Sequence, residues 1–292
     1  MNSITLKAHG KLNLYLDITG RRADGYHLLK SVMQSVSVYD TLIFERTEGE
    51  GTELVCADPY FPKDSSNLIC KAAVRFFERA GVAPCGLRVT VEKRIPSMAG
   101  MAGGSADCAA ALIALNELFD SPLGRDELLE LGAGLGADVP FTMIGGTVLC
   151  EGIGEKLTAL PPLENLWFAV VRPEVRISTP EAYRAFDSLG DIERKIYGSF
   201  EAAVISRDAA GIADGLFNAL EAAVSEPEID RAKARLIEGG ALGAMMTGSG
   251  SAVFGVFSDR AAAERCIERM KDYAFAQVLE PAAEGIETTG VI

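Results

Sequence analysis

The strongest local signal in the chain is Pro96-Ser97-Met98-Ala99-Gly100-Met101-Ala102-Gly103-Gly104-Ser105-Ala106-Asp107. The alternating residues 87–92 before it predict a β-strand, and the alanine-rich residues 105–118 after it predict an α-helix. Small side chains let a ligand approach the backbone N–H groups, and a helix N-terminus adds free donors and a partial positive charge. The stretch therefore favours a phosphate-binding loop, although a flexible connector with Ser105 as a plain helix cap fits the same residues.

Two familiar nucleotide-binding loops do not match this stretch. It lacks G-x-x-x-x-G-K-[ST], so it is not a Walker-type loop. No G-x-G-x-x-G closes a first β–α turn, which disfavours a Rossmann dinucleotide site. Any phosphate site here must be of another kind.

The rest of the chain predicts strands and helices without strict alternation. Residues 12–18 alternate between apolar and polar, which predicts a strand with one buried face and places Lys11 and Asn13 together on the other. Asn67 can cap a helix that Gly81 ends, and Thr179 can cap one that begins at Pro180. Further strands are predicted at 42–45, 167–171, 244–246 and 252–257, and further helices at 126–131 and 259–273. We therefore predict an α+β fold of two lobes, an N-terminal domain over residues 1–158 and a C-terminal domain over residues 159–292.

Composition narrows the classes of partner. The chain of 292 residues is 48% hydrophobic and 24% charged, as globular proteins are, and its formal net charge is −13. That charge disfavours nucleic acid and anionic membranes as partners, but a local basic site can still bind a small anion. The six cysteines form no C-x-x-C pair, which disfavours zinc and suggests thiols in a reducing compartment. The N-terminus has no signal-peptide pattern and no apolar run approaches about 18 residues, so we expect a soluble cytoplasmic protein.

Four further stretches contain candidate site residues, each with an ordinary structural alternative. Asp138 in G-A-D-V-P-F could act as a general base or could only form a turn before proline, and Lys11 with Asn13 could support it or form a solvated face. Tyr26 and His27 in D-G-Y-H could hold a flat base or could simply pack. Residues 247–251, T-G-S-G-S, could form a second phosphate loop or a hairpin turn.

The order and spacing of these stretches together resemble the GHMP kinase superfamily, and within it the 4-diphosphocytidyl-2-C-methylerythritol kinases. The G-R-R-A-D-G-Y-H stretch at 20–27 is the discriminating one, since other members of the superfamily share the glycine loop but lack it. The other resembling segments are A-H-G-K-L-N-L-Y-L at 8–16, the glycine loop at 96–107, L-N-E-L at 115–118, L-G-A-D-V-P-F at 135–141, G-I-G-E at 152–155 and T-G-S-G-S-A-V-F at 247–254.

The resemblance implies a two-lobed fold with the active site in the cleft between the lobes. It implies that the γ-phosphate of ATP, with Mg²⁺, is transferred to the 2-hydroxyl of the cytidine-diphosphate-linked methylerythritol, a step of the non-mevalonate route to isoprenoid precursors. Asp138 and Lys11 match the catalytic pair. The residues that match substrate contacts are Asn13, Tyr26, His27, Thr179 and Tyr183, with Tyr26 and Tyr183 stacking on cytosine. Those that match the ATP site are Pro96, Gly100, Gly103, Gly104 and Ser105, with Lys93 and Asn67 expected near adenine.

The glycine loop departs from the family pattern G-L-G-G-G-S-S-D/N at three positions. Met101, Ala102 and Ala106 stand where relatives have Leu, Gly and a second Ser. Ala102 must adopt angles that suit glycine, and Ala106 lacks a hydroxyl that could serve phosphate or magnesium. The sequence therefore assigns no metal ligands, and it leaves the oligomeric state open.

Two other functions fit part of the pattern. Another GHMP kinase, acting on a sugar, homoserine or mevalonate, would share the loop but would have no base for Tyr26 and Tyr183 to stack on. A non-catalytic ligand-binding protein would have no need to keep both Lys11 and Asp138.

Overall fold

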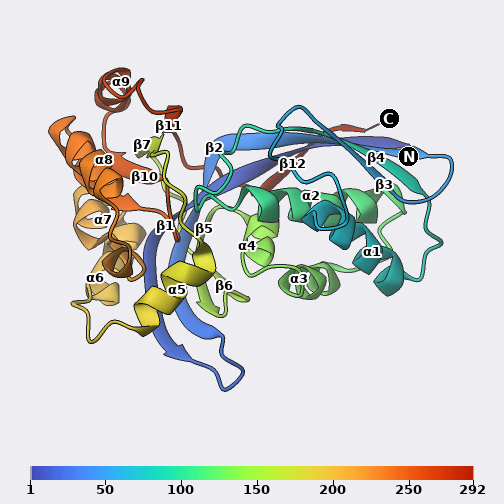
Figure 1. Ribbon diagram of the computed structural model, residues 1–292, viewed down its shortest axis with the longest axis horizontal. Helices are drawn as coiled ribbons and strands as arrows, with labels where there is room; N and C mark the ends of the chain where they lie inside the picture. Colours follow the sequence, from blue (N-terminus) through green and yellow to red (C-terminus); the bar gives the residue numbers. More distant parts are fainter. Residues whose placement is uncertain (1, 292) are drawn as a thin grey trace.

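The computed structural model describes residues 2–291 and contains two β-sheets with helices packed against each (Figure 1). The larger sheet has eight strands and the smaller has four. Strands and helices are mixed without strict alternation along the chain, so the predicted α+β class is confirmed.

The large sheet is built around one long hairpin. β1 (Ser3–Arg21) pairs with β2 (His27–Thr47) antiparallel along almost its whole length, from Ser3 opposite Glu45 to Arg21 opposite His27. The main strand order is β12-β1-β2-β4-β3. Outside this order, β5 pairs with β2, β6 pairs with β5, and β8 pairs with β1. The other strands are β3 (Thr52–Cys56), β4 (Gly86–Glu92), β5 (Thr147–Gly152), β6 (Lys156–Ala159), β8 (Phe217–Asn218) and β12 (Ile286–Val291).

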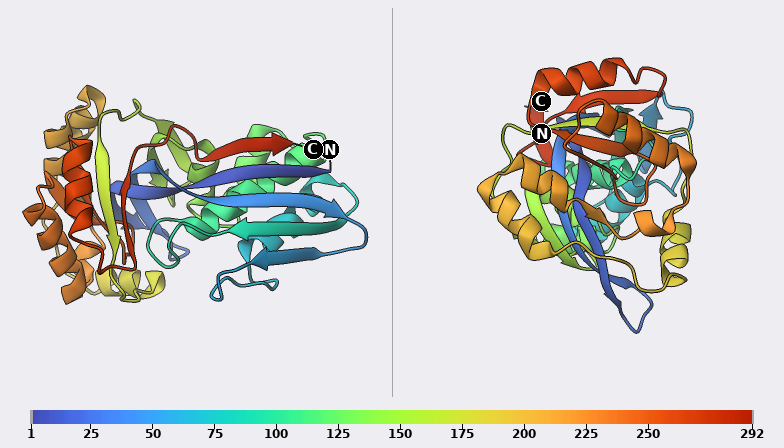
Figure 2. Two further views of the ribbon diagram at one scale, coloured as in Figure 1. Left: turned by 90° about the horizontal axis from the view of Figure 1, so that it is seen from above. Right: turned by 90° about the vertical axis from the view of Figure 1, so that its left-hand side faces the viewer.

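The last strand returns to the first. β12 pairs antiparallel with β1, with Ile4 opposite Val291, so the two ends of the chain lie side by side (Figure 2). β12 follows residue 159 in sequence yet belongs to the large sheet. The division into residues 1–158 and 159–292 stays a prediction.

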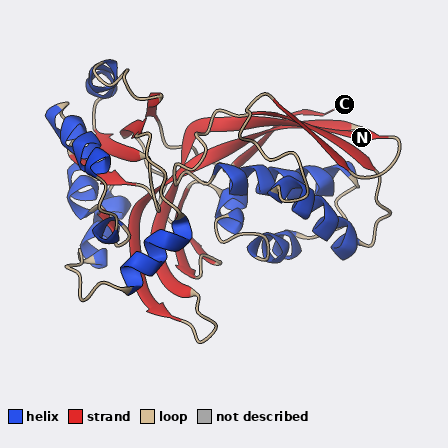
Figure 3. Ribbon diagram, viewed as in Figure 1, coloured by secondary structure: helices blue, strands red, loops and turns tan. Residues whose placement is uncertain are grey.

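Four helices lie on one side of the large sheet (Figure 3). They are α1 (Leu68–Ala80), α2 (Gly103–Leu118), α3 (Arg125–Ala133) and α4 (Val139–Ile144). α1 begins and ends as the sequence predicts, because the Asn67 side chain accepts from the Ile69 N–H and Gly81 ends the helix at φ 63°. α2 lies in the middle of this layer and is buried nearly all round, which explains why it is rich in alanine rather than amphipathic.

The small sheet, in the order β11-β7-β10-β9, is buried on both faces. Phe168 and Val170 of β7 belong to the main core, together with residues of α6 and α7, whereas Ala169 and Val171 pack in a second cluster with α8 and α9. Burial on both sides explains the uninterrupted apolar run of β7. These elements are α5 (Thr179–Asp187), α6 (Tyr197–Ser206), α7 (Ala209–Gly215), α8 (Pro227–Glu238), α9 (Arg260–Glu268), β7 (Trp167–Arg172), β9 (Gly243–Met246), β10 (Val253–Phe257) and β11 (Phe275–Leu279), with a short 3₁₀ turn at Glu221–Ala223.

The predicted elements are present, and three details differ. β1 is buried on both faces at residues 8–18, because the small-sheet side of the molecule covers the face that carries Lys11 and Asn13. The cap of α5 is Ser178 rather than Thr179. The last helix ends at Glu268 rather than at residue 273.

Two further expectations concern membranes and thiols. In the part of the chain that the structure describes, no helix combines the length and apolarity needed to cross a bilayer. All six cysteines are free thiols, and four of them are buried.

The residue before α2 has a strained backbone. Ala102 has φ 60° and ψ 26°, the left-handed conformation, which costs a residue with a Cβ about 1–2 kcal/mol. Ala102→Gly removes that Cβ, so we predict that the free energy of unfolding rises by about 0.5–1 kcal/mol after the greater chain entropy of glycine is subtracted. Urea denaturation measures the change.

The matched control for this prediction is Ala99→Gly in the same loop. Ala99 has no positive φ and is buried, so its replacement should lower the free energy of unfolding. Equal losses in the two variants would show that the conformation of Ala102 carries no strain.

Candidate active site

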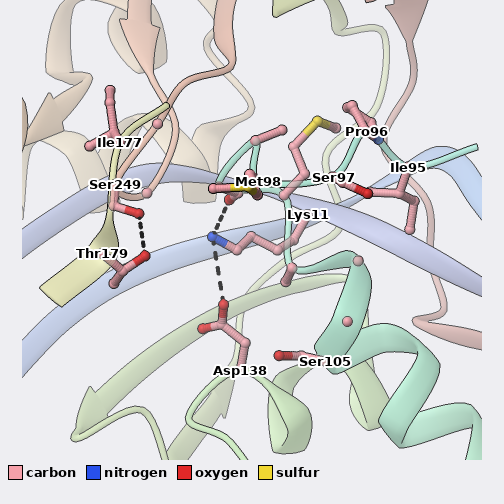
Figure 4. Close-up of a pocket in the computed structure, with 18 of the residues that line it drawn as sticks. Lys11, Ile95, Pro96, Ser97, Met98, Ser105, Asp138, Ile177, Thr179 and Ser249 are labelled. Carbon is pink, nitrogen blue, oxygen red and sulfur yellow. Dashed lines mark hydrogen bonds and ion pairs between the residues drawn. The ribbon is translucent and has the colours of Figure 1, made fainter. Parts of the chain in front are cut away.

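A cavity of about 880 Å³ lies between the elements of the two sheets (Figure 4). Its walls come from β1, the loop before α1, the glycine-rich loop, the start of α5 and the loop between β9 and β10. A second cavity of about 440 Å³ adjoins it and is lined by the hairpin tip between β1 and β2 together with α5. The two cavities share Leu29, Ala137, Thr179, Pro180 and Tyr183, so a ligand long enough could occupy both.

The N-terminus of α2 faces the larger cavity. Gly103, Gly104 and Ser105 form its first turn, and all three line the cavity. A Cβ placed on Gly104 would come no closer than 4.0 Å to any protein atom, so the exposed backbone there is open to a ligand. Free N–H groups and the helix dipole make this turn an anion site.

The loop between β9 and β10 holds the glycine-rich loop in place. Gly100 has φ 72°, and a Cβ there would lie 2.2 Å from the carbonyl oxygen of Thr247, so only glycine fits. The N–H of Ala252 donates to the carbonyl of Ala99 at 3.1 Å. Residues 247–251 thus form a turn that packs against the first loop, and Gly248, Ser249 and Gly250 also line the cavity.

Lys11 lies at the centre of this assembly and is almost completely buried. Its ammonium group donates to the carbonyl of Gly100 at 2.7 Å and to Oδ1 of Asn13 at 2.5 Å, and it lies 3.8 Å from a carboxylate oxygen of Asp138. Burial lowers the pKa of Lys11, and the charge of Asp138 opposes that effect. The alternative that Lys11 and Asn13 form a solvated face is therefore wrong.

Asp138 occupies the position before α4 and keeps 30% of its side chain exposed to the cavity. Its carboxylate is therefore free to meet a substrate hydroxyl while it faces the lysine (Figure 4). Asn13 is deeper, because its backbone N–H donates to Thr247 Oγ1 and its amide donates to Ser31 Oγ, both at 2.9 Å. Asn13 is therefore held in place itself, and its Oδ1 fixes the position of the Lys11 ammonium group.

The second cavity contains the remaining substrate candidates. His27 stacks on Tyr183 with ring centroids 4.8 Å apart and an angle of 29° between the planes, and Tyr26 is 61% exposed. Burial raises the pKa of Tyr183 to about 12, with a smaller contribution from Asp138, so its phenol stays neutral. Thr179 stands between the two cavities, 2.7 Å from Ser249 Oγ.

Comparison with known proteins finds similarity to small-molecule kinases. The models of the GHMP kinase N-terminal and C-terminal domains match residues 67–146 and 200–276. A 4-diphosphocytidyl-2-C-methyl-D-erythritol kinase of Moorella thermoacetica is 43% identical over 282 residues, which cover 93% of this chain and 96% of the relative. One from Clostridium botulinum is 41% identical over 92% of this chain and 96% of its own length.

The chain belongs to the 4-diphosphocytidyl-2-C-methyl-D-erythritol kinase family of GHMP kinases. A crystal structure of a 4-(cytidine 5'-diphospho)-2C-methyl-D-erythritol kinase is 33% identical, with a TM-score of 0.77, and the match covers 96% of this chain and all of that one. A homoserine kinase from Cytophaga hutchinsonii superposes with a TM-score of 0.81 at 20% identity, which shows a shared fold. The predicted two-lobed kinase fold is therefore confirmed.

In this kinase every predicted site residue lines one of the two cavities. The larger one has Lys11, Asn13, Asn67, Lys93, Pro96, Gly100, Gly103, Gly104, Ser105, Asp138, Thr179 and Tyr183, and the smaller adds Tyr26 and His27. Two of them already have structural partners. Asn67 caps α1 and donates to the carbonyl of Pro62, and Lys93 is paired with two carboxylates.

Sequence reasoning missed the partners of Lys93. Its ammonium bridges Asp40 of β2 and Asp107 of α2, the latter at 2.7 Å, and Asp40 also accepts the backbone N–H groups of Arg94 and Ile95. Asp107 is the last residue of the glycine-rich stretch, but nothing in the sequence pairs it with Asp40. The cluster ties the start of α2 to the sheet beneath the phosphate loop.

Position 106, where relatives carry a hydroxyl, does not reach the cavity. Ala106 is fully buried in the main core and lines neither of the two cavities. The absence of its hydroxyl therefore leaves the cavity wall unchanged, which removes the reason to expect altered magnesium contacts from this substitution.

The Lys93 cluster gives the kinase a pH-dependent stability. Burial raises the pKa of Asp107 to about 7 from 3.8, although Lys93 opposes the shift. Between these two values the folded protein binds more protons than the unfolded chain, so stability is greatest below pH 4 for this group and is lost as pH rises through 7.

We predict that Asp107→Asn removes this dependence. Urea denaturation in EDTA at several values between pH 5 and 8 should show the free energy of unfolding of the natural kinase falling relative to that of the variant. A constant difference between the two proteins across this range would contradict the raised pKa.

Proposed function

We propose that this kinase transfers the γ-phosphate of ATP to the 2-hydroxyl of 4-diphosphocytidyl-2-C-methyl-D-erythritol, in the non-mevalonate route to isoprenoid precursors. The observation that supports this best is the position of the Lys11–Asp138 pair, beside the anion-binding turn of α2 and next to a second cavity lined by aromatic rings. A nucleoside-linked polyol needs both spaces, one for the reacting hydroxyl and one for the base.

In this proposal Asp138 accepts the proton of the attacking hydroxyl. Its carboxylate is exposed to the cavity, where it can meet the hydroxyl, and it lies 3.8 Å from the ammonium group of Lys11. Lys11 cannot move far, because Gly100 and Asn13 hold its ammonium group. A fixed positive charge beside the transferring group stabilises charge in the transition state at no cost of reorganisation.

ATP would lie along the larger cavity with its phosphates at Gly103, Gly104 and Ser105. Free N–H groups of the first turn of α2 would bind the phosphate oxygens. Away from this turn the cavity is lined by Tyr60, Phe61, Pro62, Asn67, Leu68, Lys93 and Pro96. Such a largely apolar wall suits adenine, and Asn67 supports it by fixing the loop before α1.

The residues present fit a magnesium ion bound together with the nucleotide. Residues 2–291 contain no cluster of three or more His, Cys, Asp or Glu that could hold a metal alone. Mg²⁺ commonly uses one or two protein oxygens together with substrate phosphates. The hydroxyl of Ser105 and the carboxylate of Asp138, which face the same cavity, are such donors (Figure 4). When bound, the ion would neutralise charge on the phosphates.

The cytidine would occupy the second cavity. Tyr26, His27 and Tyr183 line it, and stacking of a base on an aromatic ring is worth about 1–3 kcal/mol. Sugars, homoserine and mevalonate carry no base, so this cavity disfavours the other GHMP kinase activities. A non-catalytic role would have no need for Lys11 and Asp138 to face each other at this cavity.

The proposal also covers the division of the chain into domains and the location of the protein in the cell. We keep residues 1–158 and 159–292 as the two domains, with β12 as a strand that crosses back. A cytoplasmic location fits the six free thiols.

The direct test is a phosphoryl-transfer assay with a panel of acceptors. We expect turnover of the cytidine-diphosphate-linked methylerythritol, weak activity on its uridine analogue, and almost none on unlinked methylerythritol phosphate, mevalonate or homoserine. Asp138→Asn should lower kcat by about 10²–10⁴ with little change in KM, because the lost interaction acts mainly in the transition state.

The control variant is Asp126→Asn, at an exposed aspartate in the first turn of α3, which should keep full activity. Equal use of an acceptor without a base would refute the assignment of the second cavity. Near-normal kcat in Asp138→Asn would remove this residue from the mechanism.

A further inference from the structure

One face of α5 connects the two cavities. Thr179, Tyr183 and Asp187 follow one another at intervals of four residues and so lie on the same side of the helix. Thr179 contacts Ser249 of the loop between β9 and β10, Tyr183 lines both cavities, and Asp187 reaches the hairpin tip between β1 and β2. Thr179 and Tyr183 have proposed roles at the site, whereas Asp187 has none.

Asp187 binds two residues of the hairpin. One carboxylate oxygen lies 2.6 Å from Nε2 of His27, and the other lies 3.3 Å from the guanidinium of Arg21. Arg21 also donates to the carbonyl of Gly25 inside the turn. Asp187 and Arg21 together therefore fix the imidazole ring of His27 and the backbone of the hairpin tip. The hydrogen bond from His27 lowers the pKa of Asp187, which keeps its carboxylate ionised.

These contacts leave His27 one free ring nitrogen. Nε2 faces Asp187, and one face of the ring is covered by Tyr183. An ionised carboxylate can only accept a hydrogen bond, so Nε2 must carry a proton. In the neutral ring Nδ1 is then an acceptor.

We propose that Asp187 is a positioning residue that fixes the tautomer of His27 and thereby the choice of base in the second cavity. This inference rests on the proposed function. An acceptor at Nδ1 can receive a hydrogen bond from the exocyclic amino group of cytosine. Uracil has a carbonyl oxygen at that position, so two acceptors would face each other. A site built to pair such a group rejects the analogue that leaves it unpaired.

The tautomer can be observed directly, because the chain has only two histidines, His9 and His27. Side-chain ¹⁵N NMR at pH 8.5 should show His27 protonated at Nε2 and unprotonated at Nδ1. In Asp187→Asn the amide can present either its oxygen or its NH₂ group to the ring, so this preference should weaken. His9, which contacts Val36 and Glu287 instead, should keep its spectrum in both proteins.

The consequence for base choice is measured by calorimetric titration with CDP and UDP, with the ATP site filled by saturating ADP. We expect the natural kinase to prefer CDP and Asp187→Asn to lose at least about tenfold of that preference while its affinity for ADP stays unchanged. Glu181→Gln is the matched control. Glu181 is a carboxylate on the same helix, but it is 68% exposed and contacts Arg184, so the variant should behave as the natural protein.

The outcomes separate this inference from the function it rests on. An Nδ1-protonated His27 in the natural kinase, equal affinity for CDP and UDP, or an unchanged preference in Asp187→Asn would overturn it. A purely structural role would lower the melting temperature and leave the CDP-to-UDP ratio unchanged. If the natural kinase showed the expected His27 tautomer and the preference for CDP over UDP but transferred no phosphate to the cytidine-diphosphate-linked methylerythritol, the proposed function would be refuted instead.

Discussion

The ammonium group of Lys11 joins the parts of the site that come from different regions of the chain. It donates hydrogen bonds to the carbonyl of Gly100 in the glycine-rich loop and to Asn13 of its own strand, and it faces Asp138 at the start of α4. A buried charge is costly unless each donor has a partner, so this lysine constrains the three segments to one arrangement. The close approach of Gly100 to Thr247 then extends the constraint to the small sheet.

Local sequence signals were sufficient for most of the fold. Asn67 and Gly81 mark the ends of α1, and the glycine-rich stretch predicts the strand, loop and helix that the structure contains. The burial of Lys11 was not predictable from alternation alone, because the small-sheet side of the molecule, distant in sequence, covers that face of β1. For the same reason the return of β12 to β1 has no local signal.

In the candidate site, too, local motifs predict some features and tertiary packing determines the others. The predicted site residues all line the two cavities, but their partners are not adjacent in sequence. Asp40 and Asp107 meet at Lys93 only because β2 and α2 pack together, and Asp187 meets His27 only because α5 lies over the hairpin tip. Motifs therefore predict which residues face the ligand, whereas tertiary packing determines what holds them there.

In the proposed mechanism, Lys11 and Asp138 act as one catalytic unit. A double-mutant cycle tests it most directly, with kcat measured for Lys11→Met, Asp138→Asn and the double variant, and with melting curves to verify folding. Residues that act as a unit are strongly non-additive. We expect the double variant to be hardly slower than the slower single variant. Losses that simply multiply would contradict it.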